Sequence, residues 1–327
     1  MDRRAFMKLG AAGAASVGLA AYAGAQAAYP ERTIKLVVPF PPGGVNDAVA
    51  RPWAEYVKAG LGSVVIENQG GAGGGVGAAA VARAAPDGYT ILFGSGATHV
   101  VRPIAAATQT YDPVKDFEPI AVISTGGIGV AVHPAQPFKT LKDLIEYAKA
   151  NPGKLSYASP GVGSAGHMAG ELFKSTAKVD IVHVPYRGGG PAQNDLVGGQ
   201  IPVGMINITG QVLSLHQTGK IRLLAITTPK RNPAAPDIPT CEEAGAPGCI
   251  ALNFAALFAP AGTPKPIVER LSKATQDAMK NPKFVEILSA SGFDPSSDTT
   301  PEATARFLQD ELKRWTPVIK QIGLKLD

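Results

Sequence analysis

Short apolar runs alternate along the chain with longer segments whose apolar residues recur every three or four positions. The runs at 34–38, 63–67 and 90–93 are rich in β-branched and aromatic residues, a composition typical of buried strands. The segment 140–150 instead places its apolar residues on one helical face and opens with a capping-box pattern. This alternation continues almost to the C-terminus and predicts an α/β fold with mainly parallel sheets.

The same patterns predict the order of the elements. The pair Gly126 and Gly127 separates two short apolar runs, and we expect the chain to cross between two domains there. From residue 264 onward three helical segments each open with a proline, which suits the first turn of a helix. Helices are expected at 47–58, 78–85, 140–150, around His167, and at 264–279, 282–291 and 301–322, and strands at 34–38, 63–67, 90–93, 120–123, 128–132, 155–158, 181–184, 201–206 and 221–226.

Glycine-rich loops follow three of these strands. After strand 34–38, prolines end the ladder because they cannot donate to it, and two glycines let the backbone turn. Asn46 or Asp47 can then cap the next helix. The stretch 159–164 repeats this arrangement, and the loop 95–98 follows a third strand. Unpaired N–H groups at such strand ends provide a place for a small anion, although ordinary βα connections have the same pattern.

The first 27 residues have the pattern of an export signal. Arg3 and Arg4 stand in a segment that resembles the twin-arginine motif, a weakly apolar Ala/Gly stretch follows, and Ala25-Gln26-Ala27 fits an A-x-A cleavage site. We therefore expect residues 1–27 to be a cleaved twin-arginine-type signal peptide and the mature protein to be periplasmic. A membrane span is not expected there, because a span needs about 20 strongly apolar residues.

Charge and composition narrow the class of protein. The net charge of +5 is mild and no long block of like charge occurs, so nucleic acid is not an expected partner. The 38 glycines and 28 prolines lie between apolar runs, which indicates tight connections rather than disorder. The chain that remains after removal of the signal is long enough for about two domains.

The two cysteines of the chain, Cys241 and Cys249, lie in one Pro/Gly-rich loop. In an oxidising compartment a disulfide across such a short loop is expected, and we favour it. The alternative is a pair of free buried thiols.

Several long stretches, in a fixed order, give the most specific signal in the sequence. They are VVPFPPGGVNDAVAR, VIENQGGAGGGVGAAAVARAAPDGYTILFG, YDPVKDFEPIAVI, TLKDLIEYAKANPGKLSYAS, HMAGELFK, VHVPYRGGGPAQNDLVGGQ, LFAPAGTPKPIVERL and IGLKLD. Together they resemble the Bug-type substrate-binding receptors of tripartite tricarboxylate transporters. The resemblance implies a two-domain periplasmic-binding-protein fold of type II, the Venus-flytrap fold, with helices on both faces of its sheets. It also implies a monomeric receptor that binds a small organic acid between its lobes, with membrane transporter subunits as partners.

The resemblance also implies which residues contact the ligand, with a carboxylate held by loop backbone and a helix N-terminus. The expected lobes are residues 28–126 plus 253–327 and residues 127–252. The expected ligand-binding residues are Phe40, Pro41, Pro42, Gly43, Gly44 and Asp47 in the first loop, Ser95, Gly96, Ala97 and Thr98 in the second, Ser159, Gly161, Gly163, Ser164 and His167 in the third, and Tyr186, Asn207 and Phe254 beyond them.

Two of these positions depart from the family pattern. Asn207 aligns where the family commonly has aspartate, and Phe254 aligns where it commonly has tryptophan. Without a carboxylate at position 207 the site lacks a partner for an amino group. A plain organic acid is therefore expected in preference to an amino acid.

Two other classes of function remain as alternatives. The spacing Gly73-x-Gly75-x-x-Ala78 after a strand can be interpreted as a dinucleotide fingerprint and would indicate an exported oxidoreductase. A serine hydrolase would use Ser159 or Ser164 as its nucleophile. The five histidines lack metal-ligand spacing, and we expect neither a metal nor a cofactor.

Overall fold

A computed structural model describes residues 29–326, so the predicted signal peptide lies outside the described part of the chain. The compact part of the fold begins at Thr33. Its strands are β1 (Ile34–Val38), β2 (Val64–Asn68), β3 (Thr90–Gly94), β4 (Phe117–Val132), β5 (Ser156–Ser159), β6 (Val182–Pro185), β7 (Val203–Asn207), β8 (Arg222–Ile226), β9 (Leu252–Pro260) and β10 (Phe293–Pro295).

Helices connect most of these strands. They are α1 (Val45–Tyr56), α2 (Lys58–Leu61), the 3-10 turn η1 (Ala72–Gly74), α3 (Gly75–Ala82), the π-type turn η2 (Ala97–Val101), α4 (Arg102–Ala105), α5 (Leu141–Ala150), α6 (Ala165–Ala177), α7 (Gly189–Val197), α8 (Gly210–Gln217), α9 (Lys265–Met279), α10 (Pro282–Ala290) and α11 (Pro301–Gln321).

Most of the expected elements are present, and the differences have local causes. Helix α1 begins at Val45, two residues before the expected start, and continues through Pro52 to Tyr56. Helix α7 was not expected, because its opening glycines are poor helix formers. Its Ala192 and Leu196 are fully buried, and this packing outweighs the low propensity.

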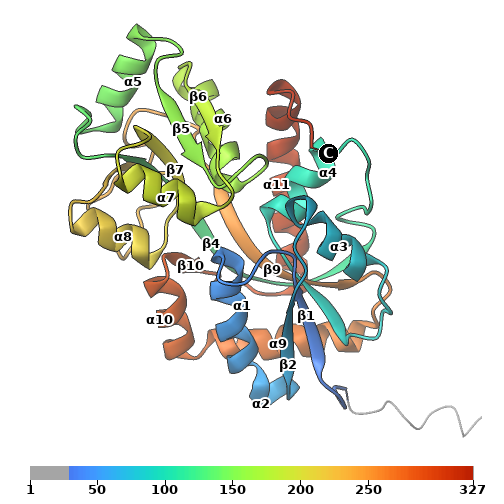
Figure 1. The fold of residues 1–327 in the computed structure, drawn as a ribbon. Helices are drawn as coiled ribbons and strands as arrows, with labels where there is room; N and C mark the ends of the chain where they lie inside the picture. Colours follow the sequence, from blue (N-terminus) through green and yellow to red (C-terminus); the bar gives the residue numbers. More distant parts are fainter. Residues whose placement is uncertain (1–28, 327) are drawn as a thin grey trace, which may run out of the picture. The chain divides into compact units, whose positions relative to one another are not determined.

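The strands of the described residues form one continuous sheet in the order β2-β1-β3-β9-β4-β7-β5-β6, with β8 and β10 also paired to β4 (Figure 1). At one end β1 is parallel to β2 and β3, and at the other β5 is parallel to β6 and β7. In the middle, the long strands β4 and β9 pair antiparallel with each other and with their neighbours. The predicted α/β class is therefore confirmed, but the sheet is mixed rather than mainly parallel. Its parallel pairings lie at the two ends, and every pairing of β4 and β9 is antiparallel.

Strand β4 runs without interruption where two separate strands were expected. Its residues up to Gly127 pair with β9, and those from Ile128 onward pair with β7. The change of partner falls at Gly126 and Gly127, where neighbouring side chains leave no room for a Cβ. A Cβ on Gly126 would lie 3.2 Å from the Phe293 ring, and one on Gly127 would lie 2.7 Å from Thr228 Cγ2.

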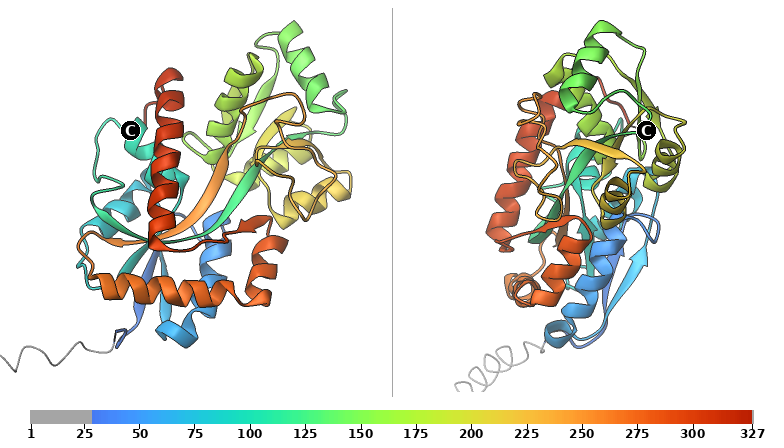
Figure 2. Two further views of the ribbon diagram at one scale, coloured as in Figure 1. Left: turned by 180° about the vertical axis from the view of Figure 1, so that it is seen from behind. Right: turned by 90° about the vertical axis from the view of Figure 1, so that its left-hand side faces the viewer.

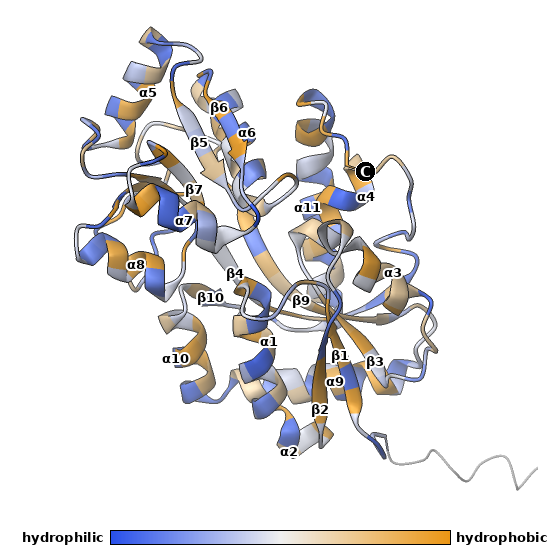
Figure 3. Ribbon diagram, in the orientation of Figure 1, coloured by the Kyte–Doolittle hydropathy of each residue, from blue (hydrophilic) through white to orange (hydrophobic). Residues whose placement is uncertain are grey.

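The faces of the sheet are covered by helices with buried apolar sides. Figure 3 shows β1 and β3 coloured as largely hydrophobic, in agreement with the full burial of Leu36 and Leu92. Helix α11 runs along β4 on the face that the left view of Figure 2 shows. Its residues Leu308 and Trp315 belong to the main hydrophobic core. No described helix is long and apolar enough to cross a membrane.

The parallel ends of the sheet place the predicted loops at shared edges. Strands β1, β2 and β3 are parallel, so their carboxyl ends lead into the loops that follow on the same edge. Strands β5, β6 and β7 are also mutually parallel and end at Ser159, Pro185 and Asn207. The three predicted ligand loops therefore all begin at the carboxyl ends of parallel strands.

Candidate functional site

The first loop leads into a helix whose N-terminus is not capped by a side chain. Gly44 is the N-cap of α1 and makes no side-chain capping bond. The first amides of a helix have no partner within the helix, so those of α1 are available to an external acceptor. We expected Asn46 or Asp47 to serve as the cap. Asp47 instead reaches back and accepts a hydrogen bond from the amide of Gly43 at 2.9 Å.

Asp47 fixes the shape of this first loop. Its carboxylate also accepts bonds from Arg51 Nε at 2.6 Å and Asn68 Nδ2 at 3.2 Å, and Asn68 donates to the Phe40 carbonyl at 3.0 Å. Burial alone raises the pKa of the Asp47 carboxyl, but the hydrogen bonds from Arg51, Gly43 and Asn68 outweigh burial, so its pKa is lowered. The side chain is 4% exposed, so Asp47 holds the loop as an anion.

Asn68 was not among the predicted site residues. It ends β2, directly beside the end of β1, and links the first loop to the neighbouring strand. Its position as a polar residue at the end of an apolar strand could have indicated this role.

The second loop is held by its own hydroxyl and by a buried aromatic cluster. Thr98 Oγ1 accepts from the Ser95 amide at 3.0 Å and donates to the Ser95 carbonyl at 3.1 Å. Tyr111 donates its hydroxyl to the Thr98 carbonyl at 2.6 Å, and the His99 ring stacks on Phe258 with centroids 3.8 Å apart. Burial lowers the pKa of His99 to about 3, so His99 is neutral at physiological pH.

Two buried polar atoms at the predicted site have no hydrogen-bond partner among the described residues. They are Ser95 Oγ, on the second loop, and Asn207 Oδ1, at the end of β7. Leaving a buried polar group unpaired costs about 1–3 kcal/mol, so such atoms are normally satisfied by water or a bound molecule. Both atoms belong to residues that the sequence predicted as ligand contacts.

The third loop closes onto the first turn of α6. Ser164 is the N-cap and its Oγ accepts from the His167 amide at 3.2 Å. His167 Nδ1 in turn accepts from the Gly163 amide at 3.1 Å. Gly163 is buried with φ +76°, a conformation in which a Cβ would be strained. His167 therefore positions the loop through its ring nitrogen.

A second histidine, His183 on β6, also contacts the third loop. Its Nε2 lies 2.7 Å from Ser159 Oγ, and its ring stacks on His167 with centroids 4.0 Å apart. Burial, followed by the nearby His167 and Lys174, lowers the pKa of His183 to about 4. Both histidines support the loop in their neutral form at pH 7.

The Ser159 and His183 pair does not have the geometry of a hydrolase site. Ser159 is fully buried, and its Oγ also accepts from the Gly161 amide at 3.2 Å. The nearby carboxylate of Glu171 is bound by the Tyr157 hydroxyl at 2.9 Å. A nucleophilic serine needs access to substrate and a base oriented by a third group. The other candidate, Ser164, uses its hydroxyl as a helix cap.

Both glycines of the possible dinucleotide fingerprint are explained by the local structure of this chain. A Cβ on Gly75 would lie 2.1 Å from Arg102 Nε, and Gly73 has φ +62°, a backbone conformation that favours glycine. The fingerprint spacing therefore gives no independent support for a bound dinucleotide.

Contacts between the loops bring the three predicted segments together. A Cβ on Gly74, at the N-terminus of α3, would lie 2.7 Å from Thr98 Cγ2 and 3.0 Å from Phe40 Cζ. A Cβ on Gly163 would lie 3.3 Å from Leu326 and 3.7 Å from Val101. The first loop thus meets the second at Gly74, and the third loop meets the turn that follows the second.

The remaining predicted residues have defined packing partners. Tyr186 donates its hydroxyl to Asp195 Oδ2 at 2.8 Å. Phe254 is 2% exposed, and its ring packs edge-to-face on Phe307 with centroids 5.1 Å apart. The ring also lies 3.6 Å from the position of a Cβ on Gly96, beneath the second loop. Among the predicted residues, those at least partly exposed are Phe40, Pro41, Pro42, Gly43, Gly44, Gly96, Ala97, Gly161, Ser164, Tyr186 and Asn207.

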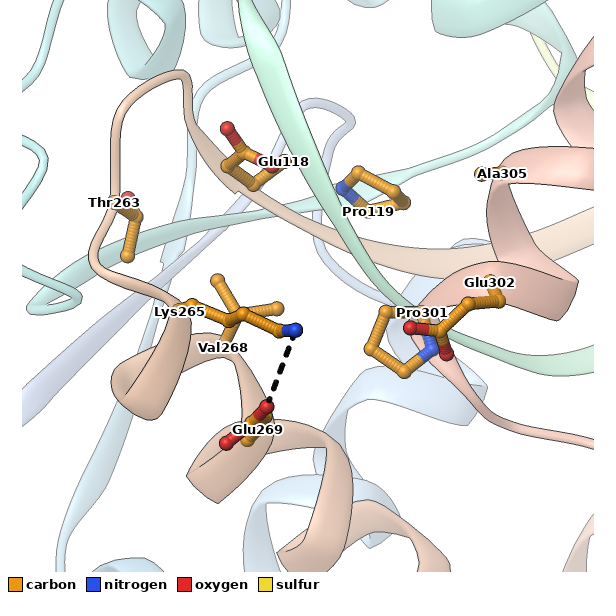
Figure 4. Close-up of a pocket in the computed structure, with 9 residues that line it drawn as sticks. All are labelled: Glu118, Pro119, Thr263, Lys265, Val268, Glu269, Pro301, Glu302 and Ala305. Atoms are coloured by element: carbon orange, nitrogen blue, oxygen red, sulfur yellow. Dashed lines mark ion pairs between the residues drawn. The ribbon is translucent and has the colours of Figure 1, made fainter.

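A separate cavity of about 350 Å³ lies away from these loops (Figure 4). It is lined by residues that include Glu118, Lys265 and Glu302, and Lys265 pairs with Glu269 at 3.9 Å. The strand residues at this cavity, Glu118 and Pro119, pair with the part of β9 that lies toward the amino end of β3. The cavity is therefore at the opposite edge of the sheet from the second loop, which follows the carboxyl end of β3. No cluster of described residues has the composition of a metal site.

Comparison with known proteins agrees with this arrangement. The sequence model of the family described as the tripartite tricarboxylate transporter family receptor matches residues 49–324. The chain belongs to this receptor family. The predicted resemblance is thereby confirmed. BugT of Bordetella pertussis, a relative of the receptor, is 35% identical over 95% of both chains.

Solved structures of similar sequence have the same fold. R. palustris Rpa4515 with adipate is 35% identical, with a TM-score of 0.83 over 91% of this chain and 99% of the other. MatC from Rhodopseudomonas palustris with bound malate is 34% identical, with a TM-score of 0.80 over 89% of this chain and 100% of the other. The periplasmic binding protein BugD is 36% identical, with a TM-score of 0.80 over 91% of this chain and 99% of the other. The receptor thus has the two-lobe fold of periplasmic binding proteins, and its family places it in the periplasm as a solute-binding protein.

Proposed function

We propose that this receptor captures a small organic acid between two lobes and delivers it to a membrane transporter of the tripartite tricarboxylate type. The lobes would be residues 28–126 plus 253–327 and residues 127–252, joined where β4 changes partner. Similarity to proteins described with adipate and malate supports a carboxylate as the ligand. The protein would bind without chemical turnover and would act as a monomer, with no nucleic-acid partner.

The observation that carries the proposal is the meeting of three loops at the ends of parallel strands. Gly163 abuts Val101 just beyond the second loop, and Gly74 abuts Phe40 and Thr98. The amides at the start of α1 have no side-chain cap and can bind an anion. A hydrogen bond to a charged group contributes about 1.5–3 kcal/mol, so three or four bring a micromolar complex, about −8 kcal/mol, within reach after ordering costs.

Asn207 bears on the kind of acid. It is neutral, and its buried Oδ1 accepts no hydrogen bond from the described residues. A ligand amino group would need a carboxylate partner at low solvent exposure to offset its desolvation. We therefore propose a plain or hydroxylated organic acid rather than an amino acid.

Export belongs to the proposal as well. Arg3 and Arg4, with the Ala25-Gln26-Ala27 site, support cleaved twin-arginine-type export. N-terminal sequencing of protein purified from the periplasm tests this: a mature chain that begins near Ala28 is expected, and an uncleaved chain would contradict it.

Ligand screening tests the binding function. Thermal shift against mono- and dicarboxylates, including adipate and malate, with amino acids as comparators, should give a raised melting temperature for at least one plain organic acid. Calorimetry of that acid should show one-to-one binding, and mass analysis of the recovered acid should show it chemically unchanged. Stabilisation by NAD or FAD but by no organic acid would contradict the proposal.

A further inference from the structure

The loop between β8 and β9 contains the only two cysteines of the chain. Cys241 and Cys249 are both fully buried and are free thiols in this structure rather than the predicted disulfide, and a hydrogen bond with the Cys249 thiol raises the pKa of Cys241. Because the chain has no other cysteine, no competing partner exists within the molecule. The two sulfur atoms therefore face each other in a site closed to solvent.

The backbone of the loop brings the two cysteines together. The Ala246 amide donates to the Cys241 carbonyl at 2.8 Å, and the Cys249 amide donates to the Ala246 carbonyl at 3.2 Å. The Cys241 amide in turn donates to the Ile226 carbonyl, at the end of β8, at 2.7 Å. The pair is thus held against the sheet by main-chain bonds that do not depend on the thiols.

This loop adjoins the place where strands change partner. Thr227 donates its amide to the Ile128 carbonyl at 2.9 Å and accepts from the Ala251 amide at 3.0 Å. Arg314 on α11 donates to the Ile250 carbonyl at 2.8 Å. Cys249 lies three residues before Leu252, the first residue of β9.

We propose that Cys241 and Cys249 form a disulfide in the exported protein, and that this bond fixes the loop that leads into β9. The two thiols lose two protons and two electrons as the S–S bond forms. The electron pair passes by thiol–disulfide exchange to a protein disulfide of the oxidising compartment, which is reduced to two thiols. Since both sulfurs are buried in the packed loop, exchange takes place while the loop is open, and the finished bond is shielded from reductants once the loop has closed.

Alkylation of the mature protein isolated from the periplasm tests for the bond. Without reductant, unfolded protein should take up no alkyl group and should have a mass lower than the reduced chain by two hydrogen atoms. After reduction in denaturant it should take up two alkyl groups. Reductant added to the folded protein should leave the bond intact. Two alkyl groups on the unreduced protein, or ready reduction of the folded protein, would overturn the proposal.

A matched pair of variants tests whether the bond fixes the loop. Under non-reducing conditions Cys241→Ser/Cys249→Ser should melt roughly 5–10 °C below the wild type, because a short closed loop restricts the unfolded chain. Refolding both proteins in reductant should remove most of this difference. The volume-conserving variant Cys241→Val/Cys249→Val separates packing from cross-linking, since it keeps an apolar loop. Equal melting of this variant and the oxidised wild type would overturn the stabilising role. Ligand affinity is a separate readout, so this test is independent of the proposed receptor function.

Discussion

At the scale of single residues, many side chains predicted as ligand contacts already hold the loops. Asp47 binds the Gly43 amide, Thr98 binds the Ser95 amide and His167 binds the Gly163 amide. These pairings follow from side-chain hydrogen bonding over three or four residues, which a sequence can suggest but not assign. Contact of these residues with a ligand stays a prediction, whereas their role in shaping the loops is visible in the structure.

Replacing Ser95 with alanine tests the unpaired hydroxyl of the second loop. If Ser95 Oγ donates to the bound acid, Ser95→Ala should weaken binding by about 10- to 100-fold, the equivalent of about 1.5–3 kcal/mol for a bond to a charged group. Stability should be unchanged or slightly higher, because a buried polar atom without a partner is removed. Calorimetry measures the affinity.

Ser124 provides the matched control. Its Oγ is also buried without a partner among the described residues, but Ser124 lies within β4 and outside the three loops. Ser124→Ala should leave the affinity unchanged. Equal affinities for wild type and Ser95→Ala would contradict a ligand contact at Ser95.

His99 should make stability depend on pH. Its pKa in the folded protein is about 3, below its ordinary value of 6.5, so the unfolded chain binds more protons between these values. The contribution of neutral His99 to the free energy of unfolding is fully present above about pH 6.5 and is lost as the pH falls toward 3. In urea unfolding, His99→Phe should reduce the loss between pH 7 and pH 4 by about 3 kcal/mol relative to the wild type. Identical losses in the two proteins would show that His99 does not titrate in this way.

At the scale of elements, alternating apolar runs predicted the βα units correctly because burial dominates those strands. The sequence missed the continuity of β4, since Gly126 and Gly127 normally interrupt a strand. Close packing of Phe293 and Thr228 against these glycines decides the outcome, and such contacts between distant segments are not encoded locally. The loop that joins β5 to α6 was predicted, but its support by His183 depends on the parallel neighbour β6.

Gly163→Ala tests the role of the third loop. The residue has φ +76°, and an added Cβ would meet Leu326 at 3.3 Å, so we expect a loss of about 1 kcal/mol in stability and weaker ligand binding. Gly219→Ala is the control, because Gly219 has φ +71° and no atom within 4 Å of the added Cβ. Both variants should lose similar stability in urea unfolding, and only Gly163→Ala should lose affinity. The same affinity in both would remove the third loop from the site.

At the scale of the whole molecule, the strand crossing joins the two ends of the sheet. Thr227 is fully buried there, accepts from the Ile128 amide at 2.9 Å and donates to the Ala251 carbonyl at 2.6 Å through Oγ1. One side chain thus links the segments that enter and leave the region 128–251. The family resemblance indicated the two-lobe fold, whereas this crossing contact became visible only in the structure.

Thr227→Val removes both side-chain bonds with little change in volume. It should lower the free energy of unfolding by about 2–4 kcal/mol, because a buried amide and a buried carbonyl each lose a partner. Thr275→Val is the control, since Thr275 is equally buried, accepts from Trp53 Nε1 and donates to the Leu271 carbonyl. X-ray scattering with and without ligand should show altered closure for Thr227→Val alone. Unaltered closure in both variants would show that Thr227 does not influence how the lobes close.

The most direct test of the receptor account is a crystal structure of the protein with the organic acid that binds most tightly in the thermal-shift screen. The account predicts density for a carboxylate bonded to amides at the start of α1 and at the second loop, with the third loop closing over it. Density for the acid elsewhere, such as in the cavity lined by Glu118 and Lys265, with no density among the three loops, would contradict it.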